Sequence, residues 1–132
     1  MGAWDAGSFD NDDAMDWVLE FVSKPGRDQI ESTFRNILDN GDAYLEALDC
    51  SIAIAAAEVV AALKNAPNPN LPEELKQVLD AKNISVDSGL INLAVRAIEQ
   101  IKTDSELQEL WEEQDPSEWI SAVDDLEKRL QQ

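Results

Sequence analysis

An alanine-rich segment in the middle of the chain does most to constrain the fold. Residues 43–65 contain neither glycine nor proline, and alanine has the highest helix propensity of all residues. At helical spacing the segment has two neighbouring apolar faces, one with Leu45, Leu48, Ile52, Val59 and Leu63 and the other with Ala43, Ala47, Ile54, Ala57 and Ala61. A helix that is apolar on two sides must be covered by several neighbours. We therefore expect residues 43–65 to form the long central helix of a bundle, capped at its start by Asp42.

Amphipathic patterns predict further helices on both sides of this segment. We expect them at about 12–22, 28–40, 73–82 and 87–102, with one more around Leu107 and Trp111 and a last one from Trp119 to Leu130. Thr103-Asp104-Ser105-Glu106 has the form of a capping box, and Asp87 is expected to cap the helix that follows it.

No segment has the alternating pattern of a strand. The predicted fold is therefore all-α: a single domain over residues 1–132, built as an irregular bundle of six or seven helices. Residues 1–11 are expected to form a loop packed on the body, and residues 66–72 a loop rich in proline and asparagine.

The charge of the chain excludes several classes of function. Its 132 residues include 28 acidic and 10 basic side chains, for a net charge of -18, and no histidine. Such a surface repels nucleic acid and anionic lipid, so we expect neither as a partner. The missing histidine excludes Ser-His-Asp and Cys-His catalysis and histidine zinc sites. Residues 1–20 and 103–118 carry acids without any base, which indicates either a solvated surface or a docking face for a basic protein.

The single cysteine and the hydropathy pattern indicate the cellular compartment of the protein. Cys50 has no partner for an intramolecular disulfide, and the apolar run after it favours a buried side chain over a nucleophile. The first twenty residues are acidic and lack the apolar core of a signal peptide. No apolar run approaches the about eighteen residues of a membrane span. We therefore expect a cytoplasmic protein.

Two groups of carboxylates have some features of a metal site. The run from Asp10 resembles the start of an EF-hand, but Ala14, Met15 and Phe21 stand where that motif needs a ligand, a glycine and a glutamate. Asp42, Glu46 and Asp49 lie on one helical stripe and could hold Mg²⁺, although a solvated acidic face explains them equally. No phosphate-binding glycine loop or nucleophile motif is present, so we expect no catalytic, cofactor or metal residues and no enzyme.

Glu58 is a single acid within the most apolar part of the central segment. At helical spacing it lies near Ser51 and Tyr44, on a narrow polar strip. Its side chain could reach water or a basic neighbour along this strip. It could also be a partly buried carboxylate poised as an acid or base, or half of a buried ion pair with Arg35 or Arg96.

Trp111 and Trp119 flank the most acidic stretch of the chain. Aromatic side chains beside acids are typical of hot spots for a protein partner, which makes Trp111 and Glu112 candidates for contact. Aromatic residues at helical spacing are also typical of a core, and both interpretations stay open here.

The N-terminal sequence resembles a known bacterial family. Met1-Gly2-Ala3-Trp4, Gly7-Ser8-Phe9-Asp10-Asn11-Asp12-Asp13-Ala14 and Asp16-Trp17 are similar to the opening of the family called domain of unknown function 4259, and the run from Ala55 to Ala62 is similar to its central helix. Asp5-Ala6 stands where that family usually has a glycine followed by a small residue. The family has no established activity. The resemblance implies a small cytoplasmic helical domain with a folded-back N-terminal unit formed by Trp4, Gly7, Phe9, Asn11 and Asp12.

These observations favour a protein-interaction module, of inhibitor or immunity type, that masks a basic partner. The alternative is a metal-binding protein or enzyme that uses the acids of the central helix, and a scaffold domain without a discrete site also stays open. The candidate residues for partner contact or family function are Trp4, Phe9, Asp10, Asn11, Asp12, Glu58, Trp111 and Glu112.

Overall fold

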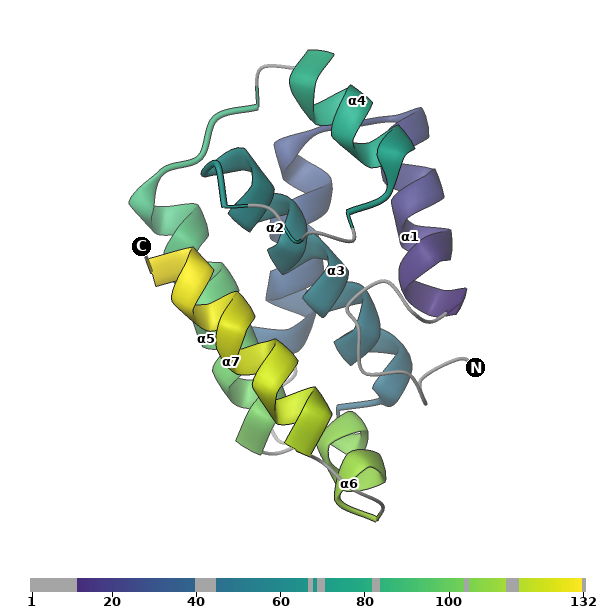
Figure 1. Ribbon diagram of the computed structural model, residues 1–132, viewed down its shortest axis with the longest axis vertical. Coiled ribbons are helices and arrows are strands. Elements are labelled where there is room, and N and C mark those ends of the chain that lie inside the picture. The colour runs from purple at the N-terminus through teal and green to yellow at the C-terminus, as the bar shows by residue number, and fades with distance from the viewer. Residues whose placement is uncertain are drawn as a thin grey trace.

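The chain folds into a bundle of helices (Figure 1). A computed structural model describes residues 12–39, 45–66, 68, 71–81, 84–103, 105–113 and 117–131. Within these residues there are seven helices and no strand: α1 (Asp12–Ser23), α2 (Arg27–Leu38), α3 (Ala47–Leu63), α4 (Glu73–Ala81), α5 (Ser88–Thr103), α6 (Glu106–Glu112) and α7 (Ser117–Gln131). The predicted all-α class is confirmed. The loop expected at residues 1–11 lies outside the described residues.

The alanine-rich helix α3 lies at the centre of the bundle. Helices α1, α2, α5, α6 and α7 all contact it, and every residue from Cys50 to Ala61 except Ile52 is buried. Small side chains allow this covering on all sides, because they let the axes of neighbouring helices come close together. Leu48, which the pattern placed on an apolar stripe, is 45% exposed because it lies in the first turn of α3, near one end of the bundle.

The start of α3 is capped from a distant part of the chain. The backbone N–H of Ala47 donates to Oε1 of Glu106 at 2.8 Å, and the backbone N–H of Glu106 donates to the carbonyl of Leu45 at 2.8 Å. The predicted start at residue 43 is wrong, because Leu45 and Glu46 precede the helix. The predicted cap, Asp42, lies outside the described residues. The carboxylate of Glu106 thus satisfies a donor at the start of α3 that has no partner within the helix.

The predicted capping box before α6 begins two residues too early. Thr103 is the last residue of α5, where its hydroxyl donates to the carbonyl of Glu99 at 2.9 Å, so it cannot also begin the next helix. The cap is Ser105: its Oγ accepts the N–H of Gln108 at 3.1 Å and donates to the carbonyl of Ile101 at 2.7 Å. Ser105 therefore joins the end of α5 to the start of α6.

Helix α3 ends in a left-handed turn at Asn65. Its φ is 68°, a conformation that asparagine tolerates better than most residues. The N–H of Asn65 donates to the carbonyl of Ala62 at 3.0 Å, and that of Ala66 donates to the carbonyl of Ala61 at 2.9 Å. These are the two bonds of a Schellman motif, which ends the helix. The motif stops α3 at Leu63, two residues before the predicted end.

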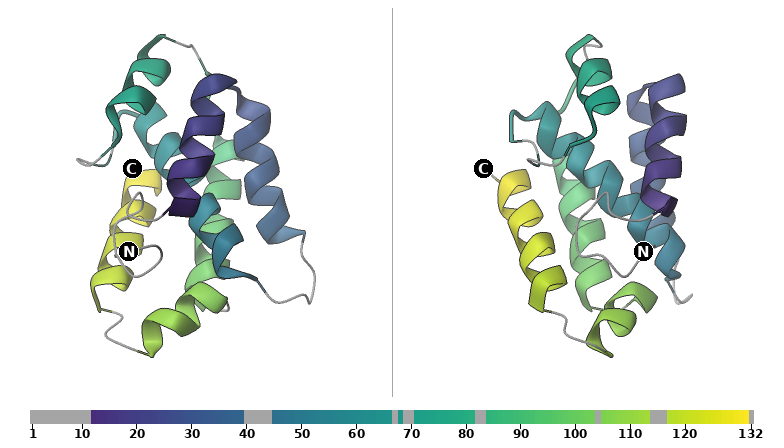
Figure 2. Two further views of the ribbon diagram at one scale, coloured as in Figure 1. Left: turned by 90° about the vertical axis from the view of Figure 1, so that its right-hand side faces the viewer. Right: turned by 45° about the vertical axis from the view of Figure 1, so that its right-hand side comes forward.

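Helix α4 lies at one extremity of the bundle, and α6 lies at the other (Figure 2). Helix α4 packs on α1 and has one buried residue, Leu75. Among the described residues, no helix has the length and apolar character needed to cross a membrane.

Candidate functional site

Glu58 is the most deeply buried charged side chain of the described residues, with 0% of its surface exposed. Two nitrogens of Arg129, on α7, donate to its two carboxylate oxygens, Nη1 to Oε1 at 2.7 Å and Nη2 to Oε2 at 3.2 Å. The side-chain amide of Asn68 donates to Oε2 at 2.9 Å. This bidentate geometry is the strongest form of an arginine–carboxylate pair, and it satisfies the buried charge.

Arg129 and Lys64 join the last turns of α7 to the end of α3. Arg129 also donates to the carbonyl of Ala66 at 3.2 Å and, through Nε, to Asp125 at 2.8 Å. Burial opposes the charge of Arg129, but the hydrogen bonds and charges of Glu58 and Asp125 outweigh it and raise its pKa. Lys64 donates in the opposite direction, to the backbone carbonyls of Arg129 and Leu130. We call Glu58, Asn68, Arg129 and Lys64 the α3–α7 junction.

This geometry decides between the interpretations of Glu58. The polar strip does not reach water, because Ser51 is buried as well and neighbouring helices cover α3. The buried ion pair was one of the open alternatives, but its partner is Arg129 and not Arg35 or Arg96. A carboxylate held by Arg129 and Asn68 is placed to hold α7 against α3.

The acids considered as metal ligands do not form a cluster in the described residues. Glu46 and Asp49 are both exposed at the start of α3, and Asp42 lies outside the described residues. Within the described part of the chain, no group of three or more His, Cys, Asp or Glu side chains could hold a metal ion. The described residues therefore provide no set of ligands for the alternative function, a metal-binding protein.

Cys50 is buried in α3. Burial raises the pKa of its thiol to about 12, although a hydrogen bond with Ser105 acts in the opposite direction. The thiolate is the nucleophilic form of cysteine, and it is scarce at neutral pH when the pKa is this high. Cys50 therefore packs as a small apolar side chain, as the sequence predicts.

The end of the bundle formed by α6, the start of α3 and the start of α7 is acidic. Its exposed acids are Glu46, Asp49, Glu109, Glu112, Glu113 and Glu118. The sequence has no lysine or arginine in residues 36–63 or 103–127, so these elements bring no base to this end. Two exposed apolar side chains lie on the same elements, Leu48 at 45% and Ile120 at 40% exposure. We call this surface the acidic end.

Lys102, at the end of α5, is already paired within the fold. Its ammonium contacts Asp124 at 2.6 Å and Glu127 at 2.7 Å, and hydrogen bonds to these two acids raise its pKa. Its charge therefore neutralises two acids of α7.

The remaining candidate residues are placed differently. Trp111 is buried and Glu112 beside it is exposed, so of the two only the glutamate presents its side chain to solvent. Trp119 is buried as well. Asp12 is the first residue of α1, and its side chain lies outside the described part of the chain. Trp4, Phe9, Asp10 and Asn11 lie outside it entirely.

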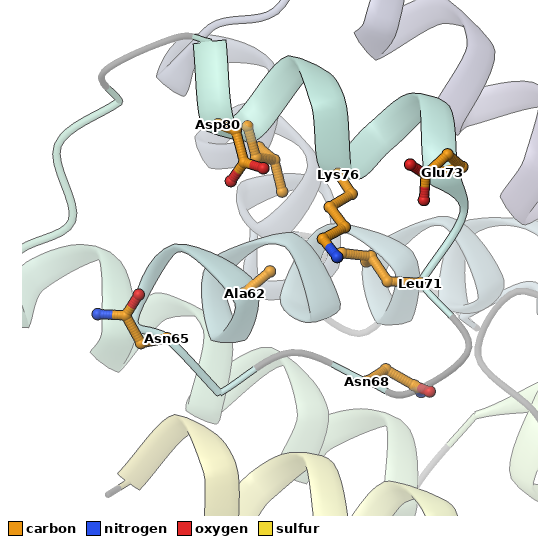
Figure 3. A pocket seen from close by; sticks show the side chains of 8 residues that line it. Ala62, Asn65, Asn68, Leu71, Glu73, Lys76 and Asp80 are labelled. Carbon is orange, nitrogen blue, oxygen red and sulfur yellow. The ribbon is translucent and has the colours of Figure 1, made fainter.

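A groove between α4 and the end of α3 is a feature that the sequence analysis missed. It has a volume of about 440 Å³ and is lined by Ala62, Asn65, Asn68, Leu71, Glu73, Lys76, Leu79 and Asp80 (Figure 3). The sequence signals near it, the proline-rich break and the short helix, predict a turn but not a cavity.

Comparison with known proteins adds one match. The family model described as "Domain of unknown function (DUF4259)" matches residues 2–122, from the N-terminal motif into α7. The match confirms the family resemblance that the N-terminal motif and the alanine-rich helix predict. No curated protein and no solved structure matches the chain.

Proposed function

We propose that this chain, which belongs to the DUF4259 family, is a protein-interaction module whose acidic end binds a basic surface of a partner protein in the cytoplasm. One observation carries the proposal: six exposed acids and two exposed apolar residues lie at one end of the bundle, on segments without a lysine or arginine. The role is binding rather than catalysis.

Physical chemistry favours a basic protein as the ligand. The carboxylates gathered at this end repel each other, and a bound basic partner would relieve that repulsion. Their negative field would also steer a basic partner toward this end as it approaches. Leu48 and Ile120 add apolar surface, which contributes to affinity without depending on salt. The same field disfavours nucleic acid and anionic membranes. An inhibitor or immunity-type protein, which masks a basic surface of its target, fits this chemistry.

The test is capture of a partner from native lysate on the immobilised chain, with two matched charge-reversal variants. The first changes Glu109 and Glu112 of α6, and Glu113 directly after it, to lysine. The control changes Glu20, Glu74 and Glu99 to lysine, which are exposed acids on α1, α4 and α5. Both variants change the net charge equally.

We expect the wild type and the control to retain the same partner at about 50 mM salt and to release much of it at about 200 mM. The α6 variant should not retain it at either concentration. Equal retention by both variants, or retention that does not depend on salt, would contradict the proposal.

A further inference from the structure

We infer that the groove between α4 and the end of α3 binds a small zwitterion of the amino-acid class with an aliphatic side chain. At about 440 Å³ the groove lies within the roughly 300–1,000 Å³ of small-molecule sites. It lies at the opposite extremity from the acidic end (Figure 1), so the inference does not depend on the proposed protein interaction.

Lys76 supplies the position for a negatively charged group. Glu73 and Asp80 stand three and four residues away on the same helix, which is the spacing that allows ion pairs. Within the described part of the chain, the Lys76 side chain nevertheless makes no hydrogen bond or ion pair. Its ammonium points from α4 toward α3, into the groove (Figure 3). A ligand carboxylate placed there would pair with the Lys76 ammonium, which is unpaired among the described residues.

The two acids of the groove require that the ligand also carry a positive charge. Glu73 and Asp80 lie on either side of Lys76 along α4, so the three side chains bring a net charge of one negative unit (Figure 3). A dianion such as a phosphate would be repelled by both acids and by the net charge of -18. A molecule with one carboxylate and one ammonium satisfies Lys76 and one acid together.

The apolar lining selects the rest of the ligand. Ala62 on α3, Leu71 before α4 and Leu79 on α4 are half-buried, and together they offer an aliphatic surface between the two helices. Burying a branched aliphatic side chain there removes apolar area from water. A leucine-like side chain matches the chemistry of this surface.

The lower rim of the groove is held in place by the α3–α7 junction. Asn68, which lines the groove, donates to Glu58, and Glu58 is fixed by Arg129. The Schellman motif at Asn65 fixes the neighbouring part of the rim. Side chains that the fold already holds in place lower the entropic cost of holding a ligand.

The experiment is a titration of the ¹⁵N-labelled full chain with L-leucine, followed through the backbone amides of Ala62, Leu71 and Lys76. L-leucinamide, which lacks the carboxylate, and 4-methylpentanoate, which lacks the amine, are titrated in parallel. We expect leucine to shift these amides in a saturable way and to bind about tenfold more tightly than either analogue, since each analogue loses one charge-assisted contact.

Two variants test the role of Lys76. Lys76→Met keeps the aliphatic stem and removes the charge, and it should bind leucine and leucinamide equally weakly. Lys128→Met, an exposed lysine on α7, changes the net charge equally and should bind leucine as the wild type does. The inference is overturned if leucine shifts none of these amides up to about 10 mM. It is also overturned if an analogue binds as tightly as leucine, or if Lys76→Met binds leucine as the wild type does.

Discussion

Arg129 and Arg27 make the same kind of contact in two regions of the molecule. Each arginine binds one acid four residues away on its own helix, Asp125 or Glu31, and one acid from a distant segment. Arg129 reaches Glu58 at 2.7 Å, and Arg27 reaches Asp87 at 3.1 Å. The side chain of Glu58 is 0% exposed, whereas that of Asp87 is 61% exposed.

This difference in burial decides what each arginine contributes. Water can take the place of Arg27 beside Asp87, so the exposed pair adds little to stability. Water cannot reach Glu58, and a buried carboxylate without its partner is costly. The α3–α7 junction therefore holds the fold together, while the Arg27 pair only supports an interface between α2 and the start of α5.

The strongest way to test the comparison is to remove the arginine from the buried pair. We expect Arg129→Met to lower the free energy of unfolding by about 3–5 kcal/mol, because Glu58 is left without its charged partner in the core. The measurement is urea unfolding followed by tryptophan fluorescence.

Two further variants separate the buried charge from lost packing. Arg35→Met removes an exposed arginine of α2 and should change the free energy by no more than about 0.5 kcal/mol. The double variant Glu58→Gln/Arg129→Met should be more stable than Arg129→Met alone, because glutamine carries no charge. If it is less stable, packing and not charge explains the loss.

Removing the distant cap of α3 should have the next largest effect. We expect Glu106→Ala to cost about 1 kcal/mol, because the N–H of Ala47 loses its acceptor at the start of the central helix. The matched control is Glu112→Ala on the exposed face of the same helix, with a change of no more than about 0.5 kcal/mol. Equal losses in the two variants would show that Glu106 does not act as a cap.

Lys102 lies between the two extremes of burial. Its side chain is about a quarter exposed, and it pairs with Asp124 and Glu127 of α7. We expect Lys102→Met to cost up to about 1 kcal/mol in the same unfolding measurement, with a smaller loss in high salt. A loss as large as that of Arg129→Met would show that burial does not determine the strength of these pairs.

The smallest effect is expected at Asp87. The hydrogen bond from Arg27 and those from backbone amides, Leu90 first among them, lower the pKa of its carboxyl below the usual value. A lowered pKa stabilises the fold at pH values above the unfolded-state pKa of about 3.9, and this contribution is lost as the pH falls through the folded-state pKa. Asp87→Asn keeps the cap on Leu90 and removes the charge.

The variant should therefore be slightly less stable than the wild type near neutral pH, by less than Lys102→Met. Urea unfolding over a pH series measures the difference, which should shrink as the pH falls below about 4. A difference that stays constant through this range would mean that the charge of Asp87 contributes nothing.

The parts of the fold that the sequence predicted correctly depend on contacts between near neighbours. Asp87 caps α5 as expected, because its acceptor and the N–H of Leu90 are three residues apart. The apolar run of α3 predicted a central helix, because its composition alone requires covering on every side.

The errors concern contacts between distant residues. The start of α3 was misplaced because its cap, Glu106, is 59 residues away. The partner of Glu58 was missed for the same reason, since Arg129 is 71 residues away and no periodic pattern relates the two positions. The groove beside α4 depends on how two helices cross, which a pattern within one helix does not specify.

The separation between Glu58 and Arg129 has a consequence for synthesis of the protein. A ribosome adds about 5–20 residues each second, so Glu58 is made several seconds before the arginine that neutralises it. During that time the most apolar helix of the nascent chain carries a carboxylate without its arginine, and such a charge favours solvent over a collapsed interior. The buried acid of α3 can therefore be neutralised by its arginine only once α7 has been made.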